Sequence, residues 1–482
     1  MNTALKQLSY DELFAENLLL KQELADLKRL IFGQKRERFI SNKGNSQLAL
    51  GLEAEPAVVE EETIEEITYR RRKQSTKHTP HSRRELPAHL PRHEIIIEPE
   101  EDISGLSKIG EEVTEELEYE PGTLFVNRYV RPKYAKAEGI IIGTLPSRPI
   151  DKGIPGAGLL AHIFINKFID HLPLYRQRQI FKRQGVDLSA STLDNWITAG
   201  YDLLFPLYEL QRERIVNKEY LMADETPIQV LDKRKKGKSH RGYFWVYYDP
   251  LRKEILFDYQ NTRGRAGPFG ILKDFKGYLE TDGYNIYDEI GQWETIQLLG
   301  CMAHARRYFD KSLSNDKNRS ESMLAQIQRL YKIEALAREN NYSFEQRYQI
   351  RQRESLPILE EMKVWLDTNA LQVLPKSTMG RAIGYMLGRW KYLMRYVEDG
   401  RFEIDNNLIE NAIRLVALGR KNYLFAGSHN GAKRSALIYT LVANAKLQGL
   451  EPFGYMRDVL TRIADYPYKD LTDLLVVNWK EK

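Results

Sequence analysis

Cysteine is almost absent from this chain of 482 residues, in which Cys301 is the single thiol. One cysteine forms no intrachain disulfide and cannot supply a cysteine-based zinc site alone. No apolar run approaches the ~18 residues of a membrane-spanning helix, which excludes an integral membrane protein. The first residues, MNTALKQLSYDELFAEN, lack the basic start, apolar middle and small-residue cleavage site of a secretory signal. These absences predict a cytoplasmic protein.

A large excess of one charge is also missing. Lys and Arg number 72 and Asp and Glu 67, so the formal net charge of +5 does not by itself indicate a nucleic-acid partner. The charges are instead segregated, with glutamates between Glu53 and Glu66 and a basic run from Arg70 to Arg84. Such blocks usually mark a solvated linker and less often an arm that binds a polyanion. The length predicts roughly three domains.

Residues 1–40 carry a coiled-coil pattern. Leu13, Leu20 and Leu27 recur at every seventh residue, and Asn17 occupies an a position of the same heptads. A buried Asn at that position pairs with its twin in a two-stranded coiled coil, so the pattern predicts a homo-oligomer. A single amphipathic helix packed within its own chain is the alternative. Residues 41–90 are predicted to form a charged flexible linker, and residues 91–150 a small β module.

A helix-turn-helix pattern occupies residues 151–215. One helix is predicted over Tyr175–Gln184, with Gly185 suited to a left-handed C-cap and Ser189 or Ser191 to the N-cap of a second helix. The second helix of such a pair can enter the major groove of DNA, although plain helical hairpins share the pattern. A basic cluster on the first helix favours DNA. The candidate DNA contacts are Arg176, Arg178, Lys182, Arg183, Ser191, Thr192 and Asn195.

Strand and helix signals alternate after Tyr220. The segments EYLMADETPIQVL, GYFWVYYDP and KEILFDYQ are predicted to form three consecutive strands, and GYLETDGYNIY and TIQLLGCMAHARRYF each a strand that leads into a helix. This order is typical of a ribonuclease-H-like sheet, although many α/β folds share these ingredients. The sequence therefore predicts a multidomain α/β protein with a core over residues 216–425, an all-helical insertion at about 310–380 and a C-terminal helical segment at 426–482.

Two acidic residues stand where such a sheet can use them. Asp224 lies inside the first strand and Asp282 closes the fourth, although acidic residues are depleted in strands. Neighbouring carboxylates can bridge hard divalent cations such as Mg²⁺, and two such ions about 3.5–4 Å apart can activate a hydroxyl and stabilise the leaving oxygen of a phosphodiester. A turn aspartate at each strand end is the simpler interpretation of either residue alone.

A third carboxylate would complete the cage, and Glu410 is the candidate. It lies beside the apolar face of a predicted helix, with Glu403, Asp405 and the Asn406-Asn407 pair as competitors. A surface salt bridge with Arg414, four residues later, is the alternative role.

Cys301 and His304 share one helical turn. Two ligands do not make a closed metal site, so Cys301 is predicted to be a core residue. His304 begins a basic helix and is a candidate to face the scissile phosphate.

Five ordered motifs, ADETP, TDGY, CMAHARRYF, DNNLIENAIR and GRKNYLFAGS, resemble the transposases of the insertion-sequence 66 family. The upstream GLLAHIFINKFIDHLPLYRQRQIFKRQGVDLSASTLDNWI and the N-terminal FGQKRERF are also similar, so the resemblance spans almost the whole chain. It implies a DDE transposase with a ribonuclease-H-like core, in which Asp224, Asp282 and Glu410 are catalytic and hold Mg²⁺, with Mn²⁺ as a substitute. It also implies a leucine-zipper or homeodomain-like N-terminal module, a C-terminal domain and two small accessory proteins of the same element.

One departure from the family concerns zinc. The family resemblance implies cysteine pairs on either side of the β module, but this chain reads PEEDISGLSKIGEEV and RPKYAKAEGII at those places. A zinc site is therefore not expected, and the module is predicted to be a metal-free relic.

The resulting hypothesis is a nucleoid-associated cytoplasmic transposase that cleaves double-stranded DNA at the inverted repeats of its element and joins it to a target. Phosphate contacts are expected from Arg306, Arg307, Arg414, Arg420 and Lys421. A DNA-binding regulator with an inactive core and a structure-specific nuclease are the alternatives. Cleavage separates the regulator from the others, and strand transfer separates the transposase from the nuclease.

Overall fold

A computed structural model describes residues 122, 124–127, 133–136, 139–142, 147–151, 153–231 and 239–480, all within one unit of the chain, Glu120–Lys482. The predicted coiled coil, the linker and most of the β module lie outside the described residues. From that module a two-stranded antiparallel sheet remains, β1 (Lys133–Lys136) and β2 (Gly139–Ile142). None of the helices in these ranges combines the length and the apolar character that a membrane crossing demands.

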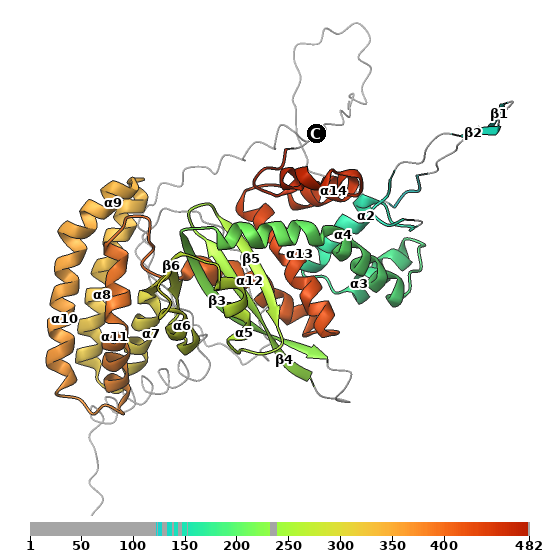
Figure 1. Ribbon diagram of the computed structural model, residues 1–482. Coiled ribbons are helices and arrows are strands. Elements are labelled where there is room, and N and C mark those ends of the chain that lie inside the picture. The colour runs from blue at the N-terminus through green and yellow to red at the C-terminus, as the bar shows by residue number, and fades with distance from the viewer. Residues whose placement is uncertain are drawn as a thin grey trace, which may run out of the picture. The chain divides into compact units, whose positions relative to one another are not determined.

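The centre of the unit is a mixed sheet (Figure 1). Its strands are β3 (Tyr220–Leu231), β4 (Ser239–Asp249), β5 (Glu254–Gln260), β6 (Gly277–Thr281) and β7 (Ile296–Gly300), in the order β5-β4-β3-β6-β7. The first three are antiparallel neighbours, whereas β6 pairs in parallel with β3 and β7 in parallel with β6. The short β8 (Phe425–Ala426) adds to the far end of β3. The meander and the two strand–helix units expected from the sequence are therefore present.

Each face of this sheet has its own core because side chains alternate along β3. Met222, Ile228 and Val230 join a core with α12 (Asn407–Tyr423) and α13 (His429–Leu447). Leu221 and Ala223 face the opposite way, into a core with α5 (Ala266–Leu272) and α6 (Asn285–Ile290).

The edge strand β5 is closed by side chains of two helices. Asn444 of α13 accepts from the Ile255 N–H at 2.9 Å and donates to the Ile255 carbonyl at 2.7 Å. Thr440 Oγ1 accepts from the Phe257 N–H, and the Tyr208 hydroxyl donates to the Phe257 carbonyl. The outward backbone groups of these two strand residues are thereby paired without a further strand.

The region of the predicted helix-turn-helix, residues 151–215, contains α2 (Ala157–Phe168), the hairpin of α3 (Leu174–Arg183) and α4 (Ala190–Val216), and the turn between them. Gly185 has φ +85°, as expected of a left-handed cap, and Ser189 accepts from the Thr192 N–H as the N-cap of α4. The N-cap is thus Ser189 and not Ser191. Helix α4 has 27 residues, and Leu204, Leu207 and Ile215 extend its buried face onto the sheet.

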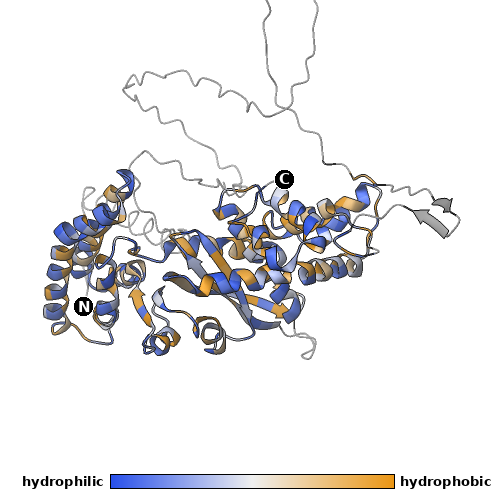
Figure 2. Cartoon of the chain, turned by 45° about the horizontal axis from the view of Figure 1, so that its top comes forward, coloured by the Kyte–Doolittle hydropathy of each residue, from blue (hydrophilic) through white to orange (hydrophobic). Residues whose placement is uncertain are grey.

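The helical insertion is also longer than the expected 310–380. It comprises α7 (Met302–Ser312), α8 (Lys317–Glu339), α9 (Phe344–Ile350), a π-helical turn (Arg351–Ser355), α10 (Leu356–Ala370) and α11 (Thr378–Met394). Hydrophobic and hydrophilic residues alternate around these helices (Figure 2).

A buried ion pair joins the insertion to the chain that follows it. Arg351, fully buried, forms two hydrogen bonds with Glu334 at 2.8 Å each. It also donates to the carbonyls of Tyr396, Asp399 and Phe402. One guanidinium therefore fixes the segment that leads into α12.

The C-terminal helix α14 (Pro452–Arg462) packs against α2 and is followed by a 3₁₀ segment, Tyr468–Leu474. Met456, Val459 and Leu460 belong to the same core as α12 and α13. The segment 426–482 thus packs onto the central unit.

Candidate functional site

Two parallel strands bring the predicted aspartates together. Asp224 lies in β3, Asp282 directly follows β6, and the preceding residues Ala223 and Thr281 are partners in the register. Ligand oxygens of Asp224, Glu225 and Asp282 all lie within 4.8 Å of one another. The pair was expected from the sequence, but Glu225 was missed, because simple strand alternation assigns it to the opposite face from Asp224. Its only sequence signal is a second acidic residue inside an apolar strand.

The electrostatics of this cluster suit a cation. Burial raises the pKa of Asp224 well above its usual range, and the negative charges of Glu225 and Asp282 raise it further. Burial also raises the pKa of Glu225, although Arg263 opposes this with a hydrogen bond at 2.7 Å. Within the described part of the chain, Glu225 Oε2 is buried without a hydrogen-bond partner. Crowded, partly buried carboxylates of this kind fit a hard divalent cation, which relieves their mutual repulsion.

The turn that carries Asp282 is held by the helical insertion. Asp282 Oδ1 accepts from the Tyr284 N–H at 2.8 Å, and Gly283 has φ +86°, which favours glycine. From α11, the Tyr385 hydroxyl donates to the Asp282 carbonyl at 2.9 Å and Arg389 donates to the Gly283 carbonyl at 2.8 Å. The insertion thus holds the main chain of Asp282 and Gly283 and in this way positions the Asp282 carboxylate.

Glu410 lies in the first turn of α12, close to the cluster but outside the group within 4.8 Å. Its two carboxylate oxygens accept hydrogen bonds from Arg307 of α7, at 3.0 and 2.8 Å. Burial is the main cause of the raised pKa of Asp224, and the charge of Glu410 adds to it. The structure therefore brings Asp224 and Asp282 together and holds Glu410 beside them.

The competitors of Glu410 serve structural contacts. Glu403 forms an ion pair with Arg347, and Asp405 accepts hydrogen bonds from the Tyr331 hydroxyl and the Asn407 N–H. Asp405 thereby supports the start of α12, although the N-cap residue itself is Asn406.

The two residues of the CMAH motif have different surroundings. Cys301 is buried and its thiol donates to Asn406 Oδ1 at 2.9 Å, which confirms the expected core position. His304 Nε2 lies 3.0 Å from Arg307 Nη1 and 4.0 Å from Glu410 Oε1. His304 therefore belongs to the Arg307–Glu410 group.

The first group of candidate DNA contacts lies on α3 and the start of α4. Arg176, Arg183, Ser191 and Asn195 are exposed. Lys182 is exposed too and lies 3.5 Å from Asp187, whereas Arg178 donates to the Leu188 carbonyl and so stabilises the turn between the helices. Thr192 contacts the cap residue Ser189.

The second group lies along α7 and α12. Arg414 and Lys421 are exposed on α12, and Arg306 is half-buried on α7. Arg307 binds Glu410, and Arg420 donates to the Pro227 carbonyl, which ties the end of α12 to β3.

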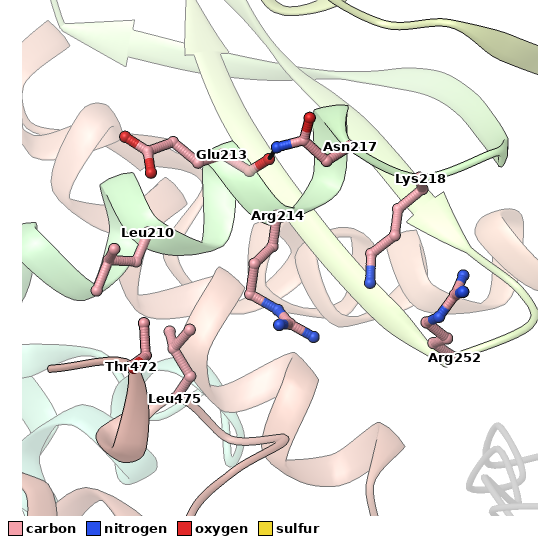
Figure 3. A pocket seen from close by; sticks show the side chains of 8 residues that line it. All are labelled: Leu210, Glu213, Arg214, Asn217, Lys218, Arg252, Thr472 and Leu475. Carbon is pink, nitrogen blue, oxygen red and sulfur yellow. Dashed lines mark hydrogen bonds between the residues drawn. The ribbon is translucent and has the colours of Figure 1, made fainter. Parts of the chain in front are cut away.

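A separate cavity of about 420 Å³ lies between the end of α4 and the C-terminal 3₁₀ segment (Figure 3). Its cations already bind buried carboxylates: Arg214 and Lys218 both donate to Glu254, which is 1% exposed. Figure 3 shows both side chains beside the Arg252 side chain. This cavity contains none of the predicted site residues, and we assign its ion pairs to stability.

Glu254→Gln is expected to lower the free energy of unfolding by about 3 kcal/mol, because two cations lose a buried partner. Burial raises the pKa of Glu254, but the hydrogen bonds from Arg214 and Lys218 outweigh it and leave the pKa below its ordinary 4.5. The wild-type contribution is therefore fully present above that value and is lost as the pH falls through the lower folded pKa. Urea unfolding at pH 7 and pH 4 measures both effects. Glu213→Gln at the exposed rim is the control, and an equal loss in both variants would contradict the assignment.

Comparisons with known protein families give matches along most of the chain. The family model "Transposase IS66 family" matches residues 152–434, and "IS66 C-terminal element" matches residues 440–475. Nearer the N-terminus, "Transposase C of IS166 homeodomain" matches residues 19–95. These matches cover the whole of the candidate site.

A fourth family model, "zinc-finger binding domain of transposase IS66", matches residues 102–135. This match partly conflicts with the expectation that zinc is absent. The matched stretch itself contains neither Cys nor His.

Three relatives from Sinorhizobium fredii are similar over nearly the whole chain. The uncharacterized protein y4jD is 32% identical over 489 residues, which cover 96% of this chain and 94% of the relative. The uncharacterized protein y4qI is 32% identical over 477 residues, covering 94% and 87%. The uncharacterized protein y4hP is 33% identical over 496 residues, covering 96% and 88%.

Proposed function

The chain belongs to the IS66 transposase family, and on this premise we propose that it is a metal-dependent DNA transposase. It binds the terminal inverted repeats of its own insertion sequence, cleaves the DNA there and joins the exposed 3′ hydroxyl to a target. The observation that carries the proposal is the group of ligand oxygens from Asp224, Glu225 and Asp282 within 4.8 Å of one another. The family consists of transposases, and DNA cleavage and joining are reactions that a carboxylate cluster of this kind can support.

The sheet supports a ribonuclease-H-like core. Three antiparallel strands are followed by two parallel ones, in the order β5-β4-β3-β6-β7, and a helical insertion precedes α12. In this arrangement Asp224 and Asp282 are the catalytic aspartates, and Glu410 of α12 is the third carboxylate.

The chemistry follows from the charges. Asp224, Asp282 and Glu410 would hold divalent cations, Mg²⁺ with Mn²⁺ as a substitute, which would supply activation of the attacking hydroxyl and charge stabilisation for the leaving oxygen. Arg307 keeps the Glu410 carboxylate beside the aspartates. His304 and Arg306 lie on α7, as Arg307 does, and face the phosphate. Arg306 and Arg307 offset the negative charge of the phosphate.

DNA recognition is assigned to the helical hairpin and to α12. Exposed Arg176 and Arg183 on α3 neutralise phosphates, and Asn195 on α4 faces the bases of the repeat. Arg414 and Lys421 on α12 continue the phosphate contacts beyond the carboxylates. The N-terminal coiled coil joins two copies, and the accessory proteins of the element are further partners. We assign no zinc, because residues 102–135 lack its usual protein ligands, Cys and His.

Incubation of the protein with a labelled duplex that ends in the inverted repeat tests this proposal. With Mg²⁺ or Mn²⁺ we expect nicking at the repeat end and products joined to a second, unlabelled duplex, and neither in EDTA. Cleavage without joined products would replace the transposase with a nuclease. Specific binding with no cleavage, even after the accessory proteins are added, would replace it with a regulator.

A further inference from the structure

Among the residues that the structure describes, none packs over one face of β3 beyond the carboxylates. Glu225, Pro227, Gln229 and Leu231 share this face because side chains alternate along a strand. Arg263 covers Glu225, but Pro227 and Leu231 are exposed and Gln229 is partly exposed. On the opposite face Ile228 and Val230 are buried beneath α12 and α13. The strand is thus packed on one side only, over the half that leads away from the candidate site.

The uncovered face is three strands wide. In β4 the partners of Gln229 and Leu231 are Arg241 and Ser239, both exposed, and in β8 the partner of Gln229 is Phe425, 44% exposed. Ser239 donates to Gln229 Oε1 at 3.1 Å, which fixes the amide oxygen of Gln229 toward β4. We call this surface, made of Pro227, Gln229, Leu231, Ser239, Arg241 and Phe425, the open face.

The charges around the open face fit a polyanion. Arg241 is its one charged residue, and the adjoining acid, Glu225, is already paired with Arg263. Lys421 lies near the end of α12, where Arg420 donates to the Pro227 carbonyl, and Arg265, paired with Glu289 at the surface, lies in the loop after β5. A nucleic-acid backbone supplies matching negative charges at every step, and the open face adjoins the carboxylates to which DNA cleavage is assigned.

The length of the open face also fits a DNA duplex. From Glu225 to Leu231 the strand rises about 20 Å, at roughly 3.3 Å per residue. A duplex covers that distance in about six base pairs, at ~3.4 Å each. Ser239 orients the Gln229 amide, whose N–H groups are donors for phosphate oxygens, and the apolar Pro227, Leu231 and Phe425 can lie against sugars.

We propose that the open face binds the duplex that directly flanks the scissile phosphate, over about six base pairs. This inference rests on the proposed function, since it places the DNA by reference to the carboxylates. It adds Gln229, Ser239 and Arg241 to the DNA-binding residues.

Site-directed cross-linking tests it, because Cys301 is the single thiol of the chain and is buried. Ser239→Cys is incubated with inverted-repeat duplexes that carry a disulfide-activated tether on one phosphate, moved stepwise from the cleavage position. Because Ser239 pairs with Leu231 at the far end of the open face, we expect cross-links at tethers about six nucleotides from the cleavage position and a decline on either side. Thr368→Cys, exposed on α10, is the matched control and is expected to give none.

A second measurement is the salt dependence of DNA binding. Arg241→Ala is expected to reduce the slope of log affinity against log salt by about one, as for one lost phosphate contact. An unchanged slope together with no Ser239→Cys cross-link would overturn the inference. A Ser239→Cys disulfide between two copies, in place of the DNA cross-link, would also overturn it by showing a protein interface. Wild-type cleavage of the same duplexes is recorded in parallel, so that failure of the proposed function is distinguished from failure of the open face.

Discussion

Asp282→Asn is expected to lower the rate of DNA cleavage by about 10³-fold, while the affinity for the inverted repeat changes less than about twofold. The amide keeps the size of the side chain and its turn contact to the Tyr284 N–H, but removes one negative ligand from the cluster with Asp224. A bound metal ion contributes several kcal/mol to transition-state stabilisation, and about 4 kcal/mol corresponds to this factor. Single-turnover cleavage and a gel-shift titration with the same duplex give the two numbers.

Glu289→Gln is the matched control, since Glu289 lies on α6, is 49% exposed and pairs only at the surface with Arg265. Its cleavage rate is expected to stay within about twofold of the wild type. Equal rates for Asp282→Asn and the wild type would remove the carboxylate cluster from the mechanism. Mn²⁺ binding, followed by electron paramagnetic resonance without DNA, provides a readout that is independent of activity, and Asp282→Asn should weaken it.

The same cleavage assay identifies the third carboxylate that binds the metal. Glu410→Gln is expected to match the loss of Asp282→Asn, because we assign Glu410 to the metal. Glu225→Gln is expected to cost less, because we assign the third metal ligand to Glu410 and the ion pair with Arg263 to Glu225. The reverse order of losses would transfer the third-ligand role to Glu225.

Arg351→Met is expected to lower the free energy of unfolding by about 3–5 kcal/mol, the largest stability effect expected of a single substitution here. The change leaves Glu334 buried with only Arg347 as its cationic partner, and it removes the donor to the Tyr396, Asp399 and Phe402 carbonyls. Denaturant unfolding followed by tryptophan fluorescence measures it, since Trp365 and Trp390 lie within the insertion.

Arg353→Met is the control, because it removes another arginine from the same π-helical turn without breaking the buried ion pair of Arg351. Arg353 is 73% exposed and pairs only with its neighbour Glu354, so its replacement is expected to cost less than about 0.5 kcal/mol. Arg351→Met should also reduce cleavage at temperatures where it stays folded, because the segment it holds leads to Glu410. Similar stability for both variants would show that the buried ion pair does not hold the insertion in place.

Local patterns predicted much of this fold. Alternation and turn residues located β3 to β7, and the cap residues Gly185 and Ser189 marked the turn between α3 and α4. The Asp224–Asp282 pair followed from two acidic residues in apolar strands, because neighbouring parallel strands end at the same edge. Each of these inferences needs only residues that are close in the chain.

The remainder depends on contacts between distant residues. Arg307 and Glu410 are 103 positions apart, and no periodicity indicates that they pair. Leu408 of α12 is apolar and yet 41% exposed, because the direction in which the helix faces is set by packing on the sheet. The insertion also extends beyond its expected bounds. Its first and last helices, α7 and α11, are far apart in the sequence but pack against each other.

The paired edge of β5 has a consequence for how copies of the protein can assemble. An unpaired edge strand is a template for intermolecular β-pairing. Asn444, Thr440 and Tyr208 occupy the groups that such pairing would need at Ile255 and Phe257. A second copy therefore cannot extend the sheet through these residues, even at high local concentration, and any contact between copies has to use other surfaces.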